Sequence, residues 1–109
     1  MATNFRNKVI KEVGTTPVDI LQTAGNARVT VIGLSLANLH DKAVLASLLV
    51  EDETSTTGYY MKDVMIGPNS SLRAVNGGEK LILTANNRLT VVSSADASID
   101  VLMSFVEIV

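Results

Sequence analysis

The side chain best suited to catalysis in this sequence is its single histidine, His40, which is followed by Asp41. An imidazole held by a carboxylate can serve as a general base toward a serine nucleophile. Asp41 is only the adjacent residue, however, and no serine lies in a recognisable nucleophile turn. One histidine and no cysteine also exclude zinc sites built from three histidines or from thiolates. We therefore expect no catalytic residues and interpret His40 as an exposed loop residue.

Two other segments could hold an ion, the acidic run Glu51-Asp-Glu53 and the glycine-rich Asn76-Gly-Gly78. Calcium binds carboxylates and loop carbonyls, but adjacent acids on an extended chain point apart and the spaced D-x-D-x-D-G pattern is missing. A solvated acidic loop is the favoured interpretation, with a calcium site as the alternative. Asn76-Gly-Gly78 lacks the G-K-[ST] of a phosphate-binding loop and is typical of a tight turn. The sequence predicts no metal ion and no cofactor.

The aromatic residues offer a third kind of chemistry, stacking on bases or sugars. Phe5, Tyr59, Tyr60 and Phe105 are all that the chain contains, and none alternates with a basic cluster, so direct nucleic-acid binding is not expected. Tyr59 and Tyr60 are neighbours and must face opposite ways in a strand, which predicts one buried and one exposed ring. They leave open a carbohydrate-binding or receptor-binding alternative.

Composition narrows the class of protein. A chain of 109 residues is one domain, and its 47% hydrophobic content supports a packed core. Charged residues make up 18%, below the average of about 25%, which suggests that other subunits cover part of the surface. A net charge of -2 and a pI near 5.2 give no basic field for DNA or an anionic membrane. With no cysteine and no apolar signal segment, we expect a protein kept in the reducing cytosol or assembled there.

The last segment, Ala97 to Val109, is the most apolar part of the chain. We expect the other strands to be arranged around it. Ile99, Val101, Met103 and Phe105 recur at period two, which predicts a strand with one face in the core and the other mixed. Such an end is expected in the middle of a sheet, because a loose terminus would fray.

Turn signals divide the remaining chain into short strands. The expected strands are 8–13, 18–22, 27–37, 43–51, 57–64, 71–75, 80–84 and 88–93. Gly33 lies where the apolar parity of its strand changes, which favours a β-bulge over burial of both faces. Ala43 to Glu51 also has good helix formers, but its length and neighbours favour a strand, and we expect an edge strand there. Residues 80–84 and 88–93 are predicted to form a hairpin.

These features indicate an all-β fold: an antiparallel β-sandwich, jelly-roll-like, with eight or nine short strands. The cysteine pair and tryptophan of an immunoglobulin core are absent. We expect two parts, a basic N-terminal arm over residues 1–8 and a β-sandwich domain over residues 9–109.

The order of segments resembles a known family. Gly14-Thr-Thr-Pro17, Val29 to Asn38, Tyr59 to Asp63, Gly78-Glu-Lys-Leu81 and Ser98 to Ile108 follow one another as in the small all-β virion structural proteins of tailed bacteriophages, which are capsid decoration (cement) or tail-associated components. The resemblance covers nearly the whole chain but contains no catalytic motif. It implies a β-sandwich that assembles into trimers or rings on the particle.

Together the residues and the resemblance predict a non-enzymatic capsid decoration subunit that stabilises the shell through multivalent contacts. The alternatives are a tail or neck subunit and the carbohydrate-binding module. The expected partners are copies of the chain, as a homotrimer, and another virion protein such as the major capsid protein, with no membrane, nucleic acid or small-molecule substrate. The expected location is the virion, assembled in the host cytoplasm. The candidate interface residues are Phe5, Arg6, Lys8, Tyr59 and Tyr60.

Overall fold

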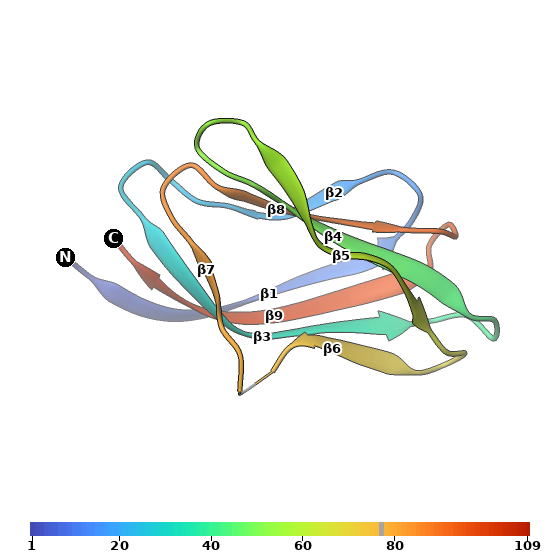
Figure 1. The fold of residues 1–109 in the computed structure, drawn as a ribbon. Coiled ribbons are helices and arrows are strands. Elements are labelled where there is room, and N and C mark those ends of the chain that lie inside the picture. The colour runs from blue at the N-terminus through green and yellow to red at the C-terminus, as the bar shows by residue number, and fades with distance from the viewer. Residues whose placement is uncertain (77) are drawn as a thin grey trace.

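Two antiparallel sheets face each other in the computed structural model, which describes residues 1–76 and 78–109 (Figure 1). The strands are β1 (Thr3–Val13), β2 (Val18–Gln22), β3 (Arg28–Asn38), β4 (Val44–Glu51), β5 (Thr57–Ile66), β6 (Ser71–Val75), β7 (Leu81–Leu83), β8 (Arg88–Ser93) and β9 (Ile99–Ile108). No helix in the described part of the chain is long and apolar enough to cross a bilayer.

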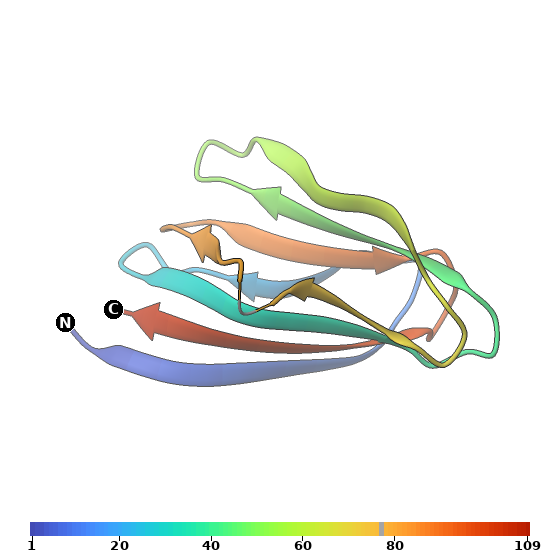
Figure 2. The same cartoon turned by 60° about the horizontal axis from the view of Figure 1, so that its bottom comes forward.

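The strand order is that of a jelly roll. The first sheet has the order β1-β9-β3-β6, with β7 also paired to β3, and the second has the order β2-β8-β4-β5 (Figure 2). β6 and β7 lie along different parts of β3 and so occupy one strand position. Apart from β4 to β5 and β6 to β7, every connection passes from one sheet to the other. The predicted all-β, jelly-roll-like sandwich is confirmed.

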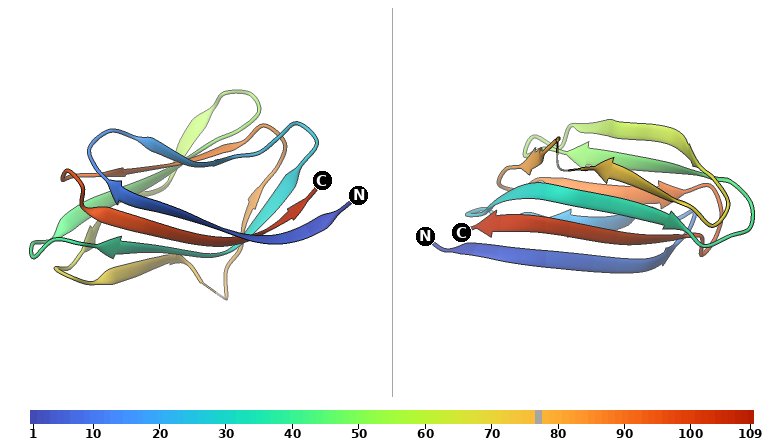
Figure 3. Two further views of the ribbon diagram at one scale, coloured as in Figure 1. Left: turned by 180° about the vertical axis from the view of Figure 1, so that it is seen from behind. Right: turned by 90° about the horizontal axis from the view of Figure 1, so that it is seen from below.

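The core fills the space between the two sheets, and β9 lies at its centre. β9 pairs with β1 on one side and β3 on the other, as the apolar C-terminal segment predicts (Figure 3). Its residues Ile99, Val101, Met103 and Phe105 are all buried. The largest fully buried partners are Val13, Ile20, Val29, Val31, Leu34, Leu36, Leu48, Val75, Leu83 and Leu89. Alternate residues of both sheets therefore meet in one layer.

The predicted bulge at Gly33 is present. The register between β3 and β9 shifts between Val31 and Gly33, and the buried parity changes from Val31 to Leu34. Ile32 lies at the shift and is exposed. β3 is therefore not buried on both faces, and the extra residue turns Ile32 outward.

Two details of strand pairing differ from the predictions. Residues 44–51 form a strand, as expected, but β4 lies between β8 and β5 and is not an edge strand. The hairpin of residues 80–84 with 88–93 is wrong, because β7 pairs with β3 whereas β8 pairs with β2 and β4. Asn87 N–H donates to Thr23 Oγ1 at 2.8 Å, which ties this crossing loop to the connection after β2. The predicted turn at Asn76-Gly-Gly78 includes Gly77, which is outside the described residues.

Candidate interaction surface

His40 has a structural role through its backbone. Its N–H donates to Asn38 Oδ1 at 2.9 Å, and its carbonyl accepts from Asn69 N–H at 3.0 Å. Within residues 1–76 and 78–109 no hydroxyl or carboxylate is hydrogen-bonded to the imidazole, and no group of three histidine, aspartate or glutamate side chains could hold a metal. His40 and Asp41 therefore do not form a nucleophile-activating pair in this structure.

The acidic loop after β4 is organised by its own aspartate. The Asp52 carboxylate accepts from Thr54 Oγ1 at 2.6 Å, Thr56 N–H at 3.1 Å and Thr54 N–H at 2.9 Å. The hydrogen bond from the Thr54 hydroxyl, followed by those from the two backbone amides, lowers the pKa of Asp52. One carboxylate oxygen of Asp52, Oδ1, is thus used to close the loop.

The two tyrosines of β5 point to opposite sides of the second sheet. Tyr59 lies on its outer face, 56% exposed, with Lys62 Nζ 5.3 Å from the ring centroid. Tyr60 is half-buried toward the core, and its hydroxyl donates to Ala74 O at 3.3 Å and to Glu79 Oε2 at 3.5 Å. Burial, and secondly the Glu79 carboxylate, raise the pKa of Tyr60. The rings therefore do not form one stacking platform.

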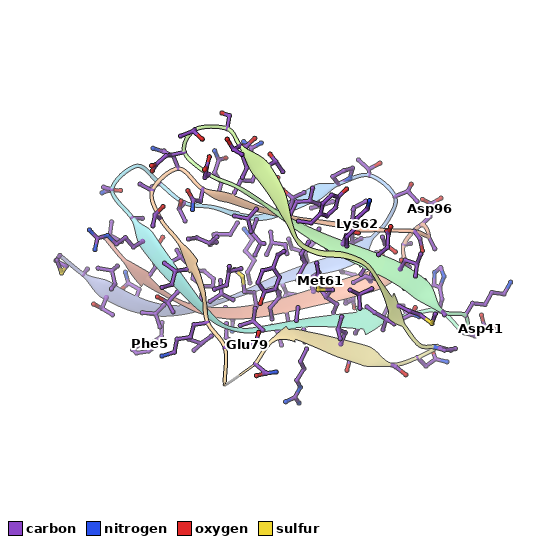
Figure 4. The ribbon with its side chains drawn as sticks, viewed as in Figure 1. Phe5, Asp41, Met61, Lys62, Glu79 and Asp96 are labelled. Carbon is purple, nitrogen blue, oxygen red and sulfur yellow. The ribbon has the colours of Figure 1, made fainter. Side chains whose placement is uncertain are left out.

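The N-terminal candidates lie on β1, in the other sheet. Phe5 is 79% exposed and projects away from the sandwich (Figure 4). Arg6 and Lys8 lie opposite the buried Phe105 and Met103, so they are on the core side of the sheet at its open edge. Arg6 Nε donates to Glu107 Oε1 at 3.0 Å. Residues 3–8 of the expected arm thus belong to β1 and pair with β9, and their expected contact with a neighbour stays a prediction.

The structure gathers exposed apolar side chains on the outer face of the first sheet. Register places Phe5 opposite Val106, Val106 opposite Thr30, and Thr30 opposite Ile82, in one row across the sheet. A second row runs from Val9 through Leu102 to Ser35. We call this surface the apolar outer face, and it comprises Phe5, Val9, Ile32, Ile82, Leu102 and Val106.

Within the part of the chain that the structure describes, the centre of the apolar outer face has no charged residue. The residues between its apolar members are Asn7, Thr30, Ser35 and Ser104. A shallow groove of about 280 Å³ lies over the bulge, bordered by Ile32, Leu102 and Arg73. The uncharged area is bounded by two charged residues. Arg73 lies on the β6 side, and Asp100 lies at the N-terminal end of β9. Contiguous exposed apolar surface of this kind is typical of an interaction site.

The outer face of the second sheet has different chemistry. Arg88 Nε lies 3.4 Å from Asp19 Oδ2, and Arg88 Nη1 lies 3.9 Å from Glu51 Oε1. Lys62 and Asp63 follow on β5, where Ser47 Oγ accepts from Asp63 N–H at 2.9 Å. The outer face of the second sheet therefore mixes charged residues with the exposed Leu45, Tyr59 and Met65 on β4 and β5. Among the described residues, the exposed apolar side chains of the first sheet extend over β1, β9, β3 and β7.

Of the residues on this surface, the sequence analysis named Phe5 and missed Val9, Ile32, Ile82, Leu102 and Val106. The sequence of β9 contained a signal for this surface. Its odd-numbered and its even-numbered residues are both mostly apolar, although only the odd-numbered ones face the core. The five predicted interface residues are not brought together, because Phe5, Arg6 and Lys8 lie on β1 of the first sheet and the tyrosines on β5 of the second.

No protein-family model and no curated protein sequence matches this chain. Among solved structures, it is similar to a subunit of the disulfide-linked pili that are Bacillus endospore appendages, with TM-score 0.57, 10% identity, and 96% of this chain and 86% of that chain covered. It is also similar to a chain in the acid-stable capsid of Helicobacter pylori bacteriophage KHP30, with TM-score 0.54, 11% identity, and 99% and 89% covered. At these identities the likeness shows a shared β-sandwich fold.

Proposed function

We propose that this protein is a non-enzymatic structural subunit of a virus particle, which associates with copies of itself through the apolar outer face. The observation that carries the proposal is the uncharged row of side chains across four strands of one sheet, from Phe5 to Ile82. Association is favoured when a second protein covers an exposed apolar surface of this kind and removes it from water. The low charge content, 18%, fits a subunit whose surface is partly covered.

The fold supports a capsid component. The alignment with the KHP30 capsid chain covers 99% of this chain and 89% of that one. Within the particle, our proposal is a decoration subunit that bridges neighbouring capsid proteins, a role that one small domain can fill because several weak contacts add through effective concentration. A homotrimer is the proposed unit, and a tail or neck subunit is the alternative. Assembly in the host cytoplasm is part of the same proposal.

The likeness to pili gives a second candidate, an appendage subunit. The structure that supports it is named for disulfide-linked pili, and the 109 residues here contain no cysteine. A pilus built from these residues would need another linkage, which makes the capsid role the better supported of the two. The carbohydrate-binding alternative is weakened by the opposite directions of Tyr59 and Tyr60.

The test of the function has two parts. Virus particles purified from cells that produce the chain should contain it in stoichiometric amounts by mass spectrometry, and immunogold labelling should place it on the shell. Absence of the chain from purified particles would refute the virion role, and label confined to tails would favour the alternative.

The second part tests the surface with matched variants. Ile82→Asp introduces a charge on the apolar outer face, and Met65→Asp does so on the second sheet's outer face; the side chains replaced are 63% and 67% exposed. We expect light scattering to show that Ile82→Asp reduces self-association, because burying an unpaired carboxylate is costly, while Met65→Asp leaves it unchanged. Equal effects would contradict the assignment of the surface.

A further inference from the structure

The four edge strands of the sandwich are not equally open to another strand. β5 has register shifts and a positive φ of 49° at Asp63, β2 has five residues, and the β6 and β7 position is divided in two. β1 pairs with β9 without interruption from Thr3 to Ile10. A long regular edge is the kind that accepts an added strand, and irregular or short edges are the kind that resist it.

The hydrogen-bond pattern shows which groups of β1 face outward. Ala2 and Val109 exchange both backbone hydrogen bonds at 2.9 Å, so they form a hydrogen-bonded pair. In an antiparallel ladder such pairs alternate with pairs that make no bonds to each other. With the unbroken register, the even-numbered residues of β1 bond β9, and the N–H and C=O of Thr3, Phe5, Asn7 and Val9 point to the open edge.

The side chains along this edge also alternate. Phe5 and Val9 lie on the apolar outer face, and Arg6 and Lys8 lie on the opposite side of the strand. Residues directly opposite one another on paired strands share a face. An added strand would therefore place one set of side chains against apolar groups and the other against two cations. Arg6 is already paired with Glu107, which leaves Lys8 without an ion pair among the described residues.

A second copy of β1 brings like charges together in the central registers of this edge, those centred on Arg6, Asn7 or Lys8. An antiparallel self-pairing centred on Asn7 places Arg6 opposite Lys8, and one centred on Arg6 or Lys8 places that residue opposite its own copy. Like charges directly opposite each other destabilise a sheet. The edge is complementary instead to a strand with carboxylates at alternate positions.

We propose that the free edge of β1 binds an extended segment of another protein in which acidic and apolar residues alternate. The acidic residues lie beside Arg6 and Lys8, and the apolar residues continue the apolar outer face beside Phe5 and Val9. This inference deepens the proposed function by naming the partner's chemistry. Backbone hydrogen bonds from the four outward-facing residues supply affinity, and the alternation supplies specificity.

The probe is a synthetic peptide of about nine residues, long enough to span the free edge, with glutamate and valine in alternation; its control has lysine in place of glutamate. We expect the purified protein to bind the glutamate peptide, more weakly at high salt, and to bind the lysine peptide at least about tenfold more weakly. Equal binding of both peptides, or binding of neither, would overturn the proposal.

A proline variant at Asn7, with a threonine variant as its control, locates the site. Asn7→Pro removes an outward N–H and keeps the β1–β9 ladder, since proline is tolerated where the N–H faces solvent. It should weaken binding of the glutamate peptide by about tenfold or more, whereas Asn7→Thr, which keeps the N–H, should not. Thermal unfolding of both variants checks that they fold. Unchanged binding by a folded Asn7→Pro protein would refute the edge as the site.

Lys8→Glu gives a charge-reversal test that is independent of the backbone. It should reverse the preference, so that the lysine peptide binds better than the glutamate peptide. Self-association that Asn7→Pro abolishes would instead identify a second copy as the occupant and overturn the acidic partner. Loss of the chain from virus particles would remove the proposed function without affecting peptide binding, so the two failures are distinguishable.

Discussion

Replacing Phe105 with alanine tests whether β9 is the centre of the core. Phe105 is 4% exposed and lies between Arg6 on β1 and Val31 on β3. Removing about 150 to 200 Å² of buried aromatic surface at about 25 cal/mol per Å² predicts a loss of about 4 to 5 kcal/mol. Measured Phe→Ala losses are about 3 to 5 kcal/mol and depend on how far the site collapses. Because a packed core relaxes only partly around a truncated side chain, we expect a loss of about 3 to 5 kcal/mol for Phe105→Ala.

Urea unfolding followed by circular dichroism measures this loss. The midpoint should fall while the slope with denaturant stays the same, because the unfolded state exposes nearly the same surface. Leu102→Ala is the control on the same strand, since Leu102 is 48% exposed; it should lose less than about 1 kcal/mol. A loss below about 1 kcal/mol for Phe105→Ala, or equal losses for the two variants, would refute the assigned faces of β9.

Three further outcomes follow from local contacts. Gly33 has no positive φ, and an added Cβ would meet Ser104 Cβ at 3.9 Å, so Gly33→Ala should keep or raise the unfolding free energy, by up to about 1 kcal/mol in the same urea assay. Asn38→Ala should lose about 1 to 3 kcal/mol, because the buried Asn38 Nδ2 donates to the carbonyls of Lys42, Ile66 and Gly67. The contribution of Asp52 should be present at neutral pH and disappear as the pH falls through its lowered pKa; unfolding of wild type and Asp52→Ala across acidic pH should therefore converge.

Much of the fold could be predicted from the sequence, because the period-two pattern reports which face of a strand is buried. It located the core residues of β9 and the bulge at Gly33. The pattern does not report which strand lies alongside. The residue pattern of β7 is the same whether the strand pairs with β8 or with β3. The turn at Ala85-Asn-Asn87 predicts that the chain changes direction, and it does not predict the partner strand. The predicted hairpin and the predicted edge at Ala43 to Val50 were both wrong for this reason.

The candidate surface depends on the part of the fold that was hardest to predict. Each strand of the first sheet contributes only one or two exposed apolar residues, which is unremarkable in a single strand. They become one surface only when β1, β9, β3 and β7 are placed side by side. The cations of the β1 edge were visible in the sequence, but the direction of its free backbone groups required the register with β9.

The apolar outer face and the β1 edge belong to one sheet, so their roles must be separated by experiment. Ile82 lies three strands away from Phe5 in the same row, which is roughly 14 Å at about 4.8 Å per strand. Substitutions that far apart, with no shared partners, usually have additive effects. Ile82→Asp should therefore reduce self-association without changing peptide binding, and Asn7→Pro should do the reverse.

The double variant completes this cycle. If the surfaces act independently, Ile82→Asp with Asn7→Pro should show the two single defects unchanged, measured by light scattering for association and by peptide titration for the edge. A peptide affinity that falls in Ile82→Asp would mean that the partner strand binds only where a second copy already covers the apolar outer face. The edge and the face would then form one composite site, and the partner would be recognised by the assembled oligomer and not by the single subunit.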